Sequence, residues 1–132
     1  MTNFIQFILR AFGIDKSKHP CPDRIRHMWE PAVADAKQAV DKAGLDAKWT
    51  HVKEVKLRRC EQQAPDGRWM WMQMNNRWAA GKYDIKGKRI TLGVGPNGEF
   101  DSASLYGVLV HELKHHLLNA IGITHHDARV NW

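Results

Sequence analysis

The sequence predicts an α+β fold, in which helices accompany a three- to four-stranded, mostly antiparallel sheet. Three observations lead to this class. Apolar residues recur every four positions near the C-terminal end, which is the spacing of one face of a helix. A second helical pattern follows Pro31 and ends at Gly44. Between these two patterns, residues 48–94 change to extended segments that turn signals separate.

Size and composition limit the classes of protein to consider. The chain has 132 residues, of which 43% are hydrophobic and 26% charged. These values exclude a disordered or fibrous chain and predict a single domain over residues 1–132. No apolar stretch approaches the length of a membrane span. Cys21 and Cys60 are too few for a disulfide framework, so we expect reduced thiols in a cytoplasmic protein, while one bridge between them stays open.

The first 23 residues are predicted to form an N-terminal helix and a linker. Apolar residues at helical spacing favour a short amphipathic helix over residues 1–12, which we expect to pack on the domain rather than on a membrane. Two prolines within residues 15–23 exclude regular structure there.

Two helical stretches are expected after the linker. Ile25, Met28 and Trp29 predict a helical turn. Pro31 is suited to the first position of a new helix, because the N–H that it lacks would be unpaired there. Gly44 is a natural end for that helix. Its apolar stripe consists of Val33, Ala36, Ala39 and Val40.

The middle of the chain is predicted to form three or four antiparallel strands. Turn signals at residues 64–67 and 85–88 separate the extended segments. These segments span residues 50–60, 68–75, 77–83 and 89–94. Residues 95–101 are expected to form a loop that leads to the last helix.

A long helix is predicted over residues 103–120. Asp101 or Ser102 is a suitable N-cap, and Gly122 follows the last turn. The buried face is expected to consist of Leu105, Leu109, Leu113, Leu117 and Ile121.

This helix carries His111-Glu112-Leu113-Lys114-His115, an HExxH motif. Residues four apart on a helix lie one turn above one another, so His111 and His115 can bind one metal ion together. Glu112 lies beside them, where it can act as a general base on a metal-bound water. Zinc is the expected ion, because it accepts imidazole and takes three protein ligands plus water in catalytic sites. Gly107, one turn before His111, would leave room near the ion.

A third ligand must come from the residues after the helix. A chain that turns back at Gly122 can bring His126 over the metal. His125 and Asp127 remain alternatives to His126, since all three lie within reach.

The run VLVHELKHHLLNAIGITHHDARVNW resembles the active-site region of the SprT-like (Spartan-type) zinc metallopeptidases. The resemblance extends over residues 78–132. It implies a minimal zincin-like fold, a metalloprotease that hydrolyses peptide bonds, and action on DNA-associated proteins. It also favours His126 as the third ligand, although Asp127 stands where the family usually has Gly or Ser. Finally, it suggests that the substrate adds as a strand to an edge strand near residues 89–94.

Three further polar residues near the motif need a role. His125, if it is not a ligand, could hydrogen-bond the developing oxyanion, and Tyr83 is another candidate for that task. We expect His116 to be solvated or paired with Glu112 rather than to bind the metal.

The positive charge is concentrated in the predicted sheet. The chain has a formal net charge of +6, and eleven basic but only four acidic residues lie between 48 and 89. Mixed with tryptophans, this charge is typical of surfaces that bind single-stranded nucleic acid, although an ordinary solvated strand face also accounts for it. The alternative function is therefore a nucleic-acid-binding module with a structural or inactive metal site. The candidate binding residues are Arg58, Arg59, Arg68, Trp69, Trp71 and Arg77.

Overall fold

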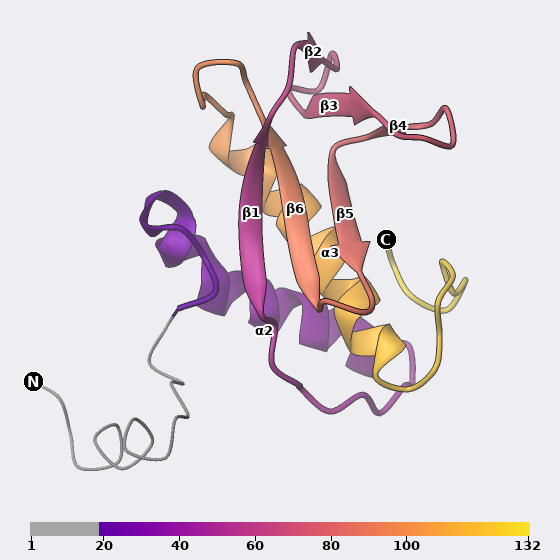
Figure 1. Ribbon diagram of the computed structural model, residues 1–132. Coiled ribbons are helices and arrows are strands. Elements are labelled where there is room, and N and C mark those ends of the chain that lie inside the picture. Colours follow the sequence, from indigo (N-terminus) through magenta and orange to yellow (C-terminus); the bar gives the residue numbers. More distant parts are fainter. Residues whose placement is uncertain (1–18) are drawn as a thin grey trace, which may run out of the picture.

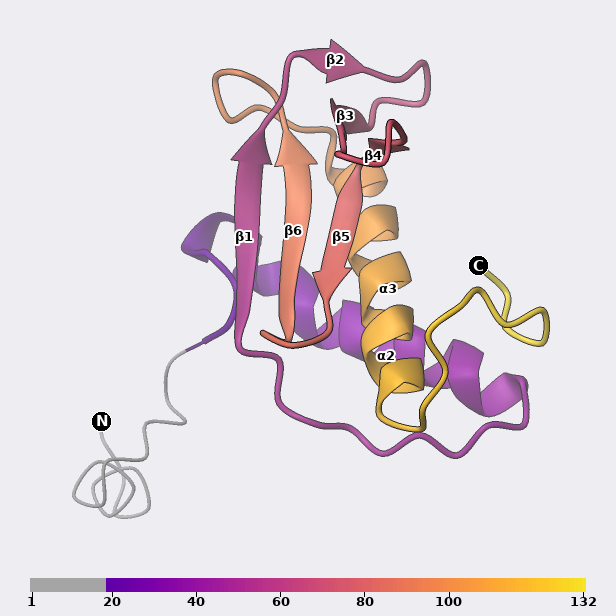
Figure 2. The same cartoon turned by 45° about the vertical axis from the view of Figure 1, so that its right-hand side comes forward.

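The computed structural model describes residues 19–132, which form an α+β structure with two small, mostly antiparallel sheets and two α-helices (Figure 1). The helix expected at residues 1–12 lies outside the described residues, as does most of the linker. Both helices lie behind the larger sheet in Figure 1, and the smaller sheet lies at one end of it in Figures 1 and 2. Among residues 19–132, no helix is long and apolar enough to cross a membrane.

The first long helix, α2, runs from Arg26 to Lys42 after a short 3-10 turn, η1, at Asp23–Ile25. Two helical stretches were expected here, but Pro31 lies inside one continuous helix. The buried residues are spaced four apart and extend across the proline, so packing of this stripe offsets the hydrogen bond that Pro31 cannot donate. They are Met28, Ala32, Ala36 and Val40, of which the last two were expected. Gly44, at a φ of +77°, ends the helix as predicted.

The larger sheet has the strand order β1-β6-β5. Strand β1 spans Glu54–Arg59, β5 spans Gly81–Asp84 and β6 spans Arg89–Val94. The turn predicted at 85–88 joins β5 and β6 into an antiparallel hairpin. The antiparallel expectation is wrong for β1, which pairs with β6 in parallel. The long connection between these two strands, which carries the smaller sheet, allows that direction.

The smaller sheet consists of β2 (Gln62–Gln63), β3 (Trp69–Met72) and β4 (Trp78–Ala79), all antiparallel. Its β3 crosses the end of β6 at Gly93, where an added Cβ would lie 2.2 Å from the carbonyl oxygen of Trp69. The absence of a side chain at Gly93 therefore permits the two sheets to meet. A satellite core joins Cys60, Trp71 and Ala79 beneath this crossing.

The last helix, α3 (Ser102–Asn119), packs against β5, β6 and α2. Asp101 caps it as predicted, because its carboxylate accepts a hydrogen bond from the Ser104 N–H at 2.9 Å. The four predicted leucines are buried, whereas Ile121 lies beyond the helix end and is 38% exposed. Glu112 and His116 are also buried, so α3 presents polar side chains to the interior.

Both cysteines are buried and free. Burial raises the pKa of the Cys21 thiol to about 12, so this thiol stays protonated and unreactive at neutral pH.

Candidate metal centre

Three imidazole rings converge at the open side of α3. His111 and His115 come from successive turns of the helix, and His126 comes from the tail that follows it. The Nε2 atoms of His111 and His115 are 3.2 Å apart, and that of His126 lies 3.1 Å from His115 and 3.2 Å from His111. Three ring nitrogens thus form a nearly equilateral triangle.

The triangle has the dimensions of three ligand positions around one tetrahedral ion. Zinc–nitrogen bonds of about 2.0–2.1 Å at tetrahedral angles separate the nitrogens by about 3.3 Å. Burial lowers the pKa of both His111 and His115 to about 4, and neighbouring imidazoles add to the effect. Both rings are therefore neutral at pH 7, which is the form that binds a metal. The cluster is close enough to hold one metal ion.

The tail returns to the helix because several contacts hold it there. Gly122 has a φ of +82°, which reverses the chain after α3. Val130 is buried in the main core. The Lys114 Nζ donates a hydrogen bond to the carbonyl oxygen of Asn131 at 2.6 Å. We call the segment 122–132 with these contacts the tail clasp.

Neighbouring side chains explain why His126 and not Asp127 faces the cluster. The Asp127 carboxylate accepts hydrogen bonds from the backbone N–H and the guanidinium of Arg129, at 2.7–2.9 Å. These bonds hold the pKa of Asp127 well below its usual range. His125 is exposed and does not belong to the cluster.

Trp132 belongs to the site, although the sequence alone did not indicate it. Its ring centroid lies 4.6 Å from that of His115, 4.7 Å from that of His126 and 5.1 Å from that of His111. The indole N–H donates to the carbonyl oxygen of Asp127 at 2.9 Å, which fixes the ring. Trp132 therefore forms an apolar wall behind all three histidines, and no motif in the sequence pointed to it.

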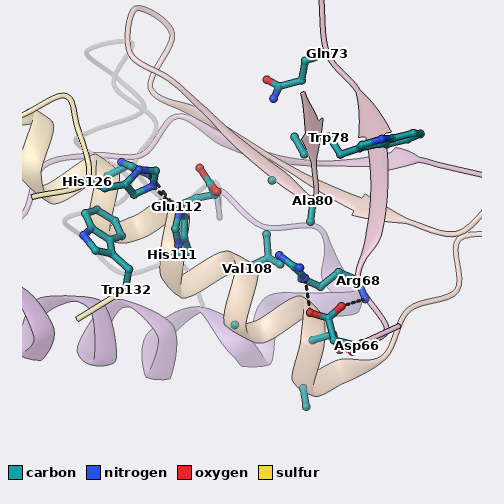
Figure 3. Close-up of a pocket in the computed structure, with 16 residues that line it drawn as sticks. Asp66, Arg68, Gln73, Trp78, Ala80, Val108, His111, Glu112, His126 and Trp132 are labelled. Atoms are coloured by element: carbon teal, nitrogen blue, oxygen red, sulfur yellow. Dashed lines mark hydrogen bonds and ion pairs between the residues drawn. The ribbon is translucent and has the colours of Figure 1, made fainter. Parts of the chain in front are cut away.

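Glu112 lies beside the imidazoles with its side chain directed into the same space (Figure 3). It is 6% exposed, and burial raises its pKa to about 8. The nearest wall is Gly81 of β5, where an added Cβ would lie 2.9 Å from the carboxylate. A cation bound by the histidines would favour the charged carboxylate and lower this pKa again.

The histidines and Glu112 line a cleft of about 800 Å³ between α3 and the two sheets. Gly107 lines it too, and an added Cβ there would meet nothing within 4 Å, so the glycine leaves the expected space. Arg68 lies away from the histidines and pairs with Asp66 at 2.6 Å (Figure 3). The side of the cluster that faces the cleft is the side at which a bound ion would accept a further ligand.

His116 lies outside the metal cluster, as expected, but the two roles expected for it are wrong. It is 1% exposed, and its hydrogen-bond partners do not include Glu112. Its Nδ1 is 2.9 Å from the Tyr83 hydroxyl, and its Nε2 is 2.9 Å from the Thr50 carbonyl oxygen. The Tyr83 hydroxyl, one of the two candidates for an oxyanion donor, is thus already hydrogen-bonded to a buried ring.

The six candidate nucleic-acid residues do not form one patch. Arg68 lines the metal cleft, whereas Arg58 lies over the Trp71 ring, with its guanidinium carbon 5.0 Å from the ring centroid. Trp71 is only 8% exposed and Trp69 is half-buried. Arg59 and Arg77 are exposed, and they line neither the metal cleft nor the hollow at Arg58 and Trp71. Of the tryptophans near the cleft, Trp78 is the accessible one, at 50%.

In comparisons with protein-family models, curated proteins and solved structures, nothing matched this chain.

Proposed function

We propose that the protein is a zinc-dependent metallopeptidase of the zincin type, similar to the SprT-like enzymes. The observation that carries the proposal is the triangle of three Nε2 atoms, 3.1–3.2 Å apart, with a buried carboxylate in the same cleft. Structural zinc sites are usually closed by a fourth protein ligand, whereas here three nitrogens face an open cleft. That arrangement favours a catalytic centre.

The residues of the centre have two roles, metal binding and proton transfer. His111, His115 and His126 would hold zinc, which when bound supplies a Lewis acid and makes water nucleophilic at neutral pH. Glu112 takes a proton from the attacking water and delivers it to the leaving nitrogen. Zinc held by the histidines would lower the pKa that burial raises, so the Glu112 carboxylate would be ionised and able to accept the proton of the water.

The substrate is proposed to pair with β5 instead of with residues 89–94, where the sequence led us to expect it. Strand β6 is central in the sheet and pairs on both sides, so no further strand can add to it. The Ala80 carbonyl accepts a hydrogen bond from the Gly93 N–H at 2.8 Å. Because bonded and non-bonded pairs alternate in antiparallel strands, the backbone groups of Gly81 and Tyr83 point to the open edge of β5. An extended peptide could pair there, next to Glu112.

The proposal is tested with Glu112→Gln beside the wild type. We expect purified wild-type protein to contain about one zinc per chain and to cleave an unfolded substrate such as casein. The variant should keep its zinc and its circular dichroism spectrum but lose cleavage by at least about a hundredfold, because general base catalysis contributes that much. Wild-type protein without zinc, or equal cleavage by both proteins, would show the proposal to be wrong.

A nucleic-acid-binding module with an inactive metal site is the second candidate. Arg68 and the exposed Trp78 line the metal cleft together and offer a cation and an aromatic face. Binding of single-stranded DNA that falls steeply with salt, and falls further in Trp78→Ala, supports this role. Binding without salt dependence would dismiss it. If the metal site is active and the protein also binds DNA, the same surface would bring DNA-associated proteins to the cleft.

A further inference from the structure

A second groove lies on the other side of the catalytic pair. Its volume is about 190 Å³, and Glu112 and His115 line both this groove and the large cleft. We call it the Ile85 groove. The residues that line it are Tyr83, Ile85, Glu112, His115, Asn119, Ile123 and Thr124. The pair that would carry out the chemistry therefore stands between two spaces, as it would between the two sides of a cleaved bond.

We propose, on the basis of the peptidase function proposed above, that the Ile85 groove binds an apolar, uncharged side chain of the residue that flanks the scissile bond. The groove is lined by the Tyr83 ring and two isoleucines. Among residues 19–132, no ionised side chain apart from Glu112 lines it, so a charged substrate residue would lose hydration there without gaining a partner. Asn119 and Thr124 are the uncharged polar groups of the lining.

The path of an extended substrate leads into this groove. A peptide paired with the free edge of β5 runs beside Gly81 at the large cleft and beside Tyr83 at the Ile85 groove. Ile85 follows β5 directly and is 48% exposed, so it is an apolar side chain that the folded chain itself leaves uncovered. The groove is therefore continuous with the edge that is proposed to hold the substrate.

The wall formed by Tyr83 is held in place. Its hydroxyl is 2.9 Å from the Nδ1 of His116, which is itself buried and bonded to Thr50. Because this bond fixes the phenol, the ring is a preformed side of the groove. The groove is also much smaller than the large cleft, so it accommodates one side chain and not a longer segment.

The experiment is a cleavage profile with charge-changed variants. Zinc-loaded protein is given a peptide mixture randomised at the two positions that flank the cleaved bond. We expect Leu, Ile, Met or Phe to be enriched about tenfold over Asp, Glu and Lys at one flank, always the same. Ile85→Lys should shift that position towards Asp and Glu, and Ile85→Glu towards Lys and Arg. The matched control is Ile121→Lys, because Ile121 is 38% exposed and lines neither space.

A profile without an apolar preference, or one that Ile85→Lys leaves unchanged, overturns the inference while the peptidase function stands. If the wild type cleaves nothing, the peptidase proposal fails. A peptide-binding measurement then tests whether the Ile85 groove prefers an apolar side chain. Zinc-loaded Glu112→Gln protein is titrated with two fluorescent peptides that differ by Leu or its near-isostere Asn. Leu should bind about tenfold more tightly than Asn, and the ratio should fall in Glu112→Gln/Ile85→Lys. Equal affinities for the two peptides would overturn the inference that the groove prefers an apolar side chain.

Discussion

Gly81 is a position at which one added atom, a Cβ, would disturb the placement of Glu112. A Cβ at this residue would lie 2.5 Å from Cγ1 of Val108 and 2.9 Å from the Glu112 carboxylate. Val108 is stiff because it is β-branched, so the clash is relieved only by movement of α3 or of the carboxylate. The glycine thus permits β5 and α3 to approach with the Glu112 side chain between them.

Gly81→Ala is therefore expected to lower both stability and cleavage. Overpacking costs about 1–3 kcal/mol, which urea unfolding of the metal-free protein would detect. Gly107→Ala is the matched control, because its methyl group meets nothing within 4 Å and the substitution favours a helix by up to about 1 kcal/mol. Equal stability of the two variants would contradict this assignment.

Glu112 gives a second test at the residue scale, which does not depend on activity. Its pKa in the folded, metal-free protein is raised to about 8, so the folded state binds this proton more tightly than the unfolded chain does. The contribution to stability is present at low pH and is lost as pH rises from about 4.5 to 8. Glu112→Gln should thus be more stable than wild type by a few kcal/mol at pH 8, but not at pH 4. An advantage independent of pH, measured with EDTA present, would contradict the buried position of the carboxylate.

Among the elements, the tail clasp is the part on which the third histidine depends. Lys114 is 8% exposed, and its ammonium donates to the Asn131 carbonyl. Because Asn131 precedes Trp132, the same bond keeps the indole against the three imidazoles. His111 and His115 keep their spacing from the helix alone, whereas His126 keeps its position only while the tail stays folded back.

Lys114→Met should therefore weaken zinc binding more than it weakens the fold. The methionine retains an apolar stem of similar length but cannot donate to Asn131. We expect the zinc dissociation constant, measured by competition with a chromogenic chelator, to rise about tenfold or more. Lys86→Met in the exposed turn after β5 is the control and should leave it unchanged. If the zinc affinity of Lys114→Met is unchanged, the tail clasp does not contribute to metal binding.

For the whole molecule, a metal ion held by the three histidines would compete with protons for the same imidazole rings. The pKa of His111 and that of His115 are both lowered to about 4 by burial, so the fold favours neutral rings. The contribution of these two rings to the stability of the metal-free protein is complete above pH 6.5 and falls as pH decreases towards 4. A bound ion adds stability only where the rings are neutral.

The rise in melting temperature caused by zinc should accordingly persist from pH 7.5 to about pH 5 and shrink as pH approaches 4, where His111 and His115 bind protons in the folded state. Calorimetric scans with zinc and with EDTA across this range would measure it. His126→Ala provides the comparison, because loss of one of three ligands should reduce the zinc-dependent rise at every pH. A rise that stays constant through pH 4 and below would contradict histidine ligation.

Local sequence patterns were sufficient for much of the fold and for part of the centre. Residues 89–94 alternate and form β6 with the predicted bounds, and Asp101 caps α3, because hydrogen bonds and burial near each residue decide these features. The pair His111 and His115 follows from helix geometry alone. Pro31 misled the interpretation, since a buried stripe from Met28 to Val40 outweighs one missing hydrogen bond.

Contacts between residues distant in sequence settled the remainder. The parallel pairing of β1 with β6, the central place of β6 and the free edge of β5 depend on how the chain crosses at Gly93, which no local pattern encodes. The structure favours His126 over Asp127 as a ligand because the Asp127 carboxylate is hydrogen-bonded to Arg129. The place of Trp132 beside the histidines depends on the tail folding back. Helix periodicity depends only on neighbours along the chain, so the sequence was sufficient to predict that His111 and His115 lie together. The third ligand, the walls of the cleft and the Ile85 groove arise where separate segments pack, because packing free energy is shared among residues whose proximity exists only in the folded state.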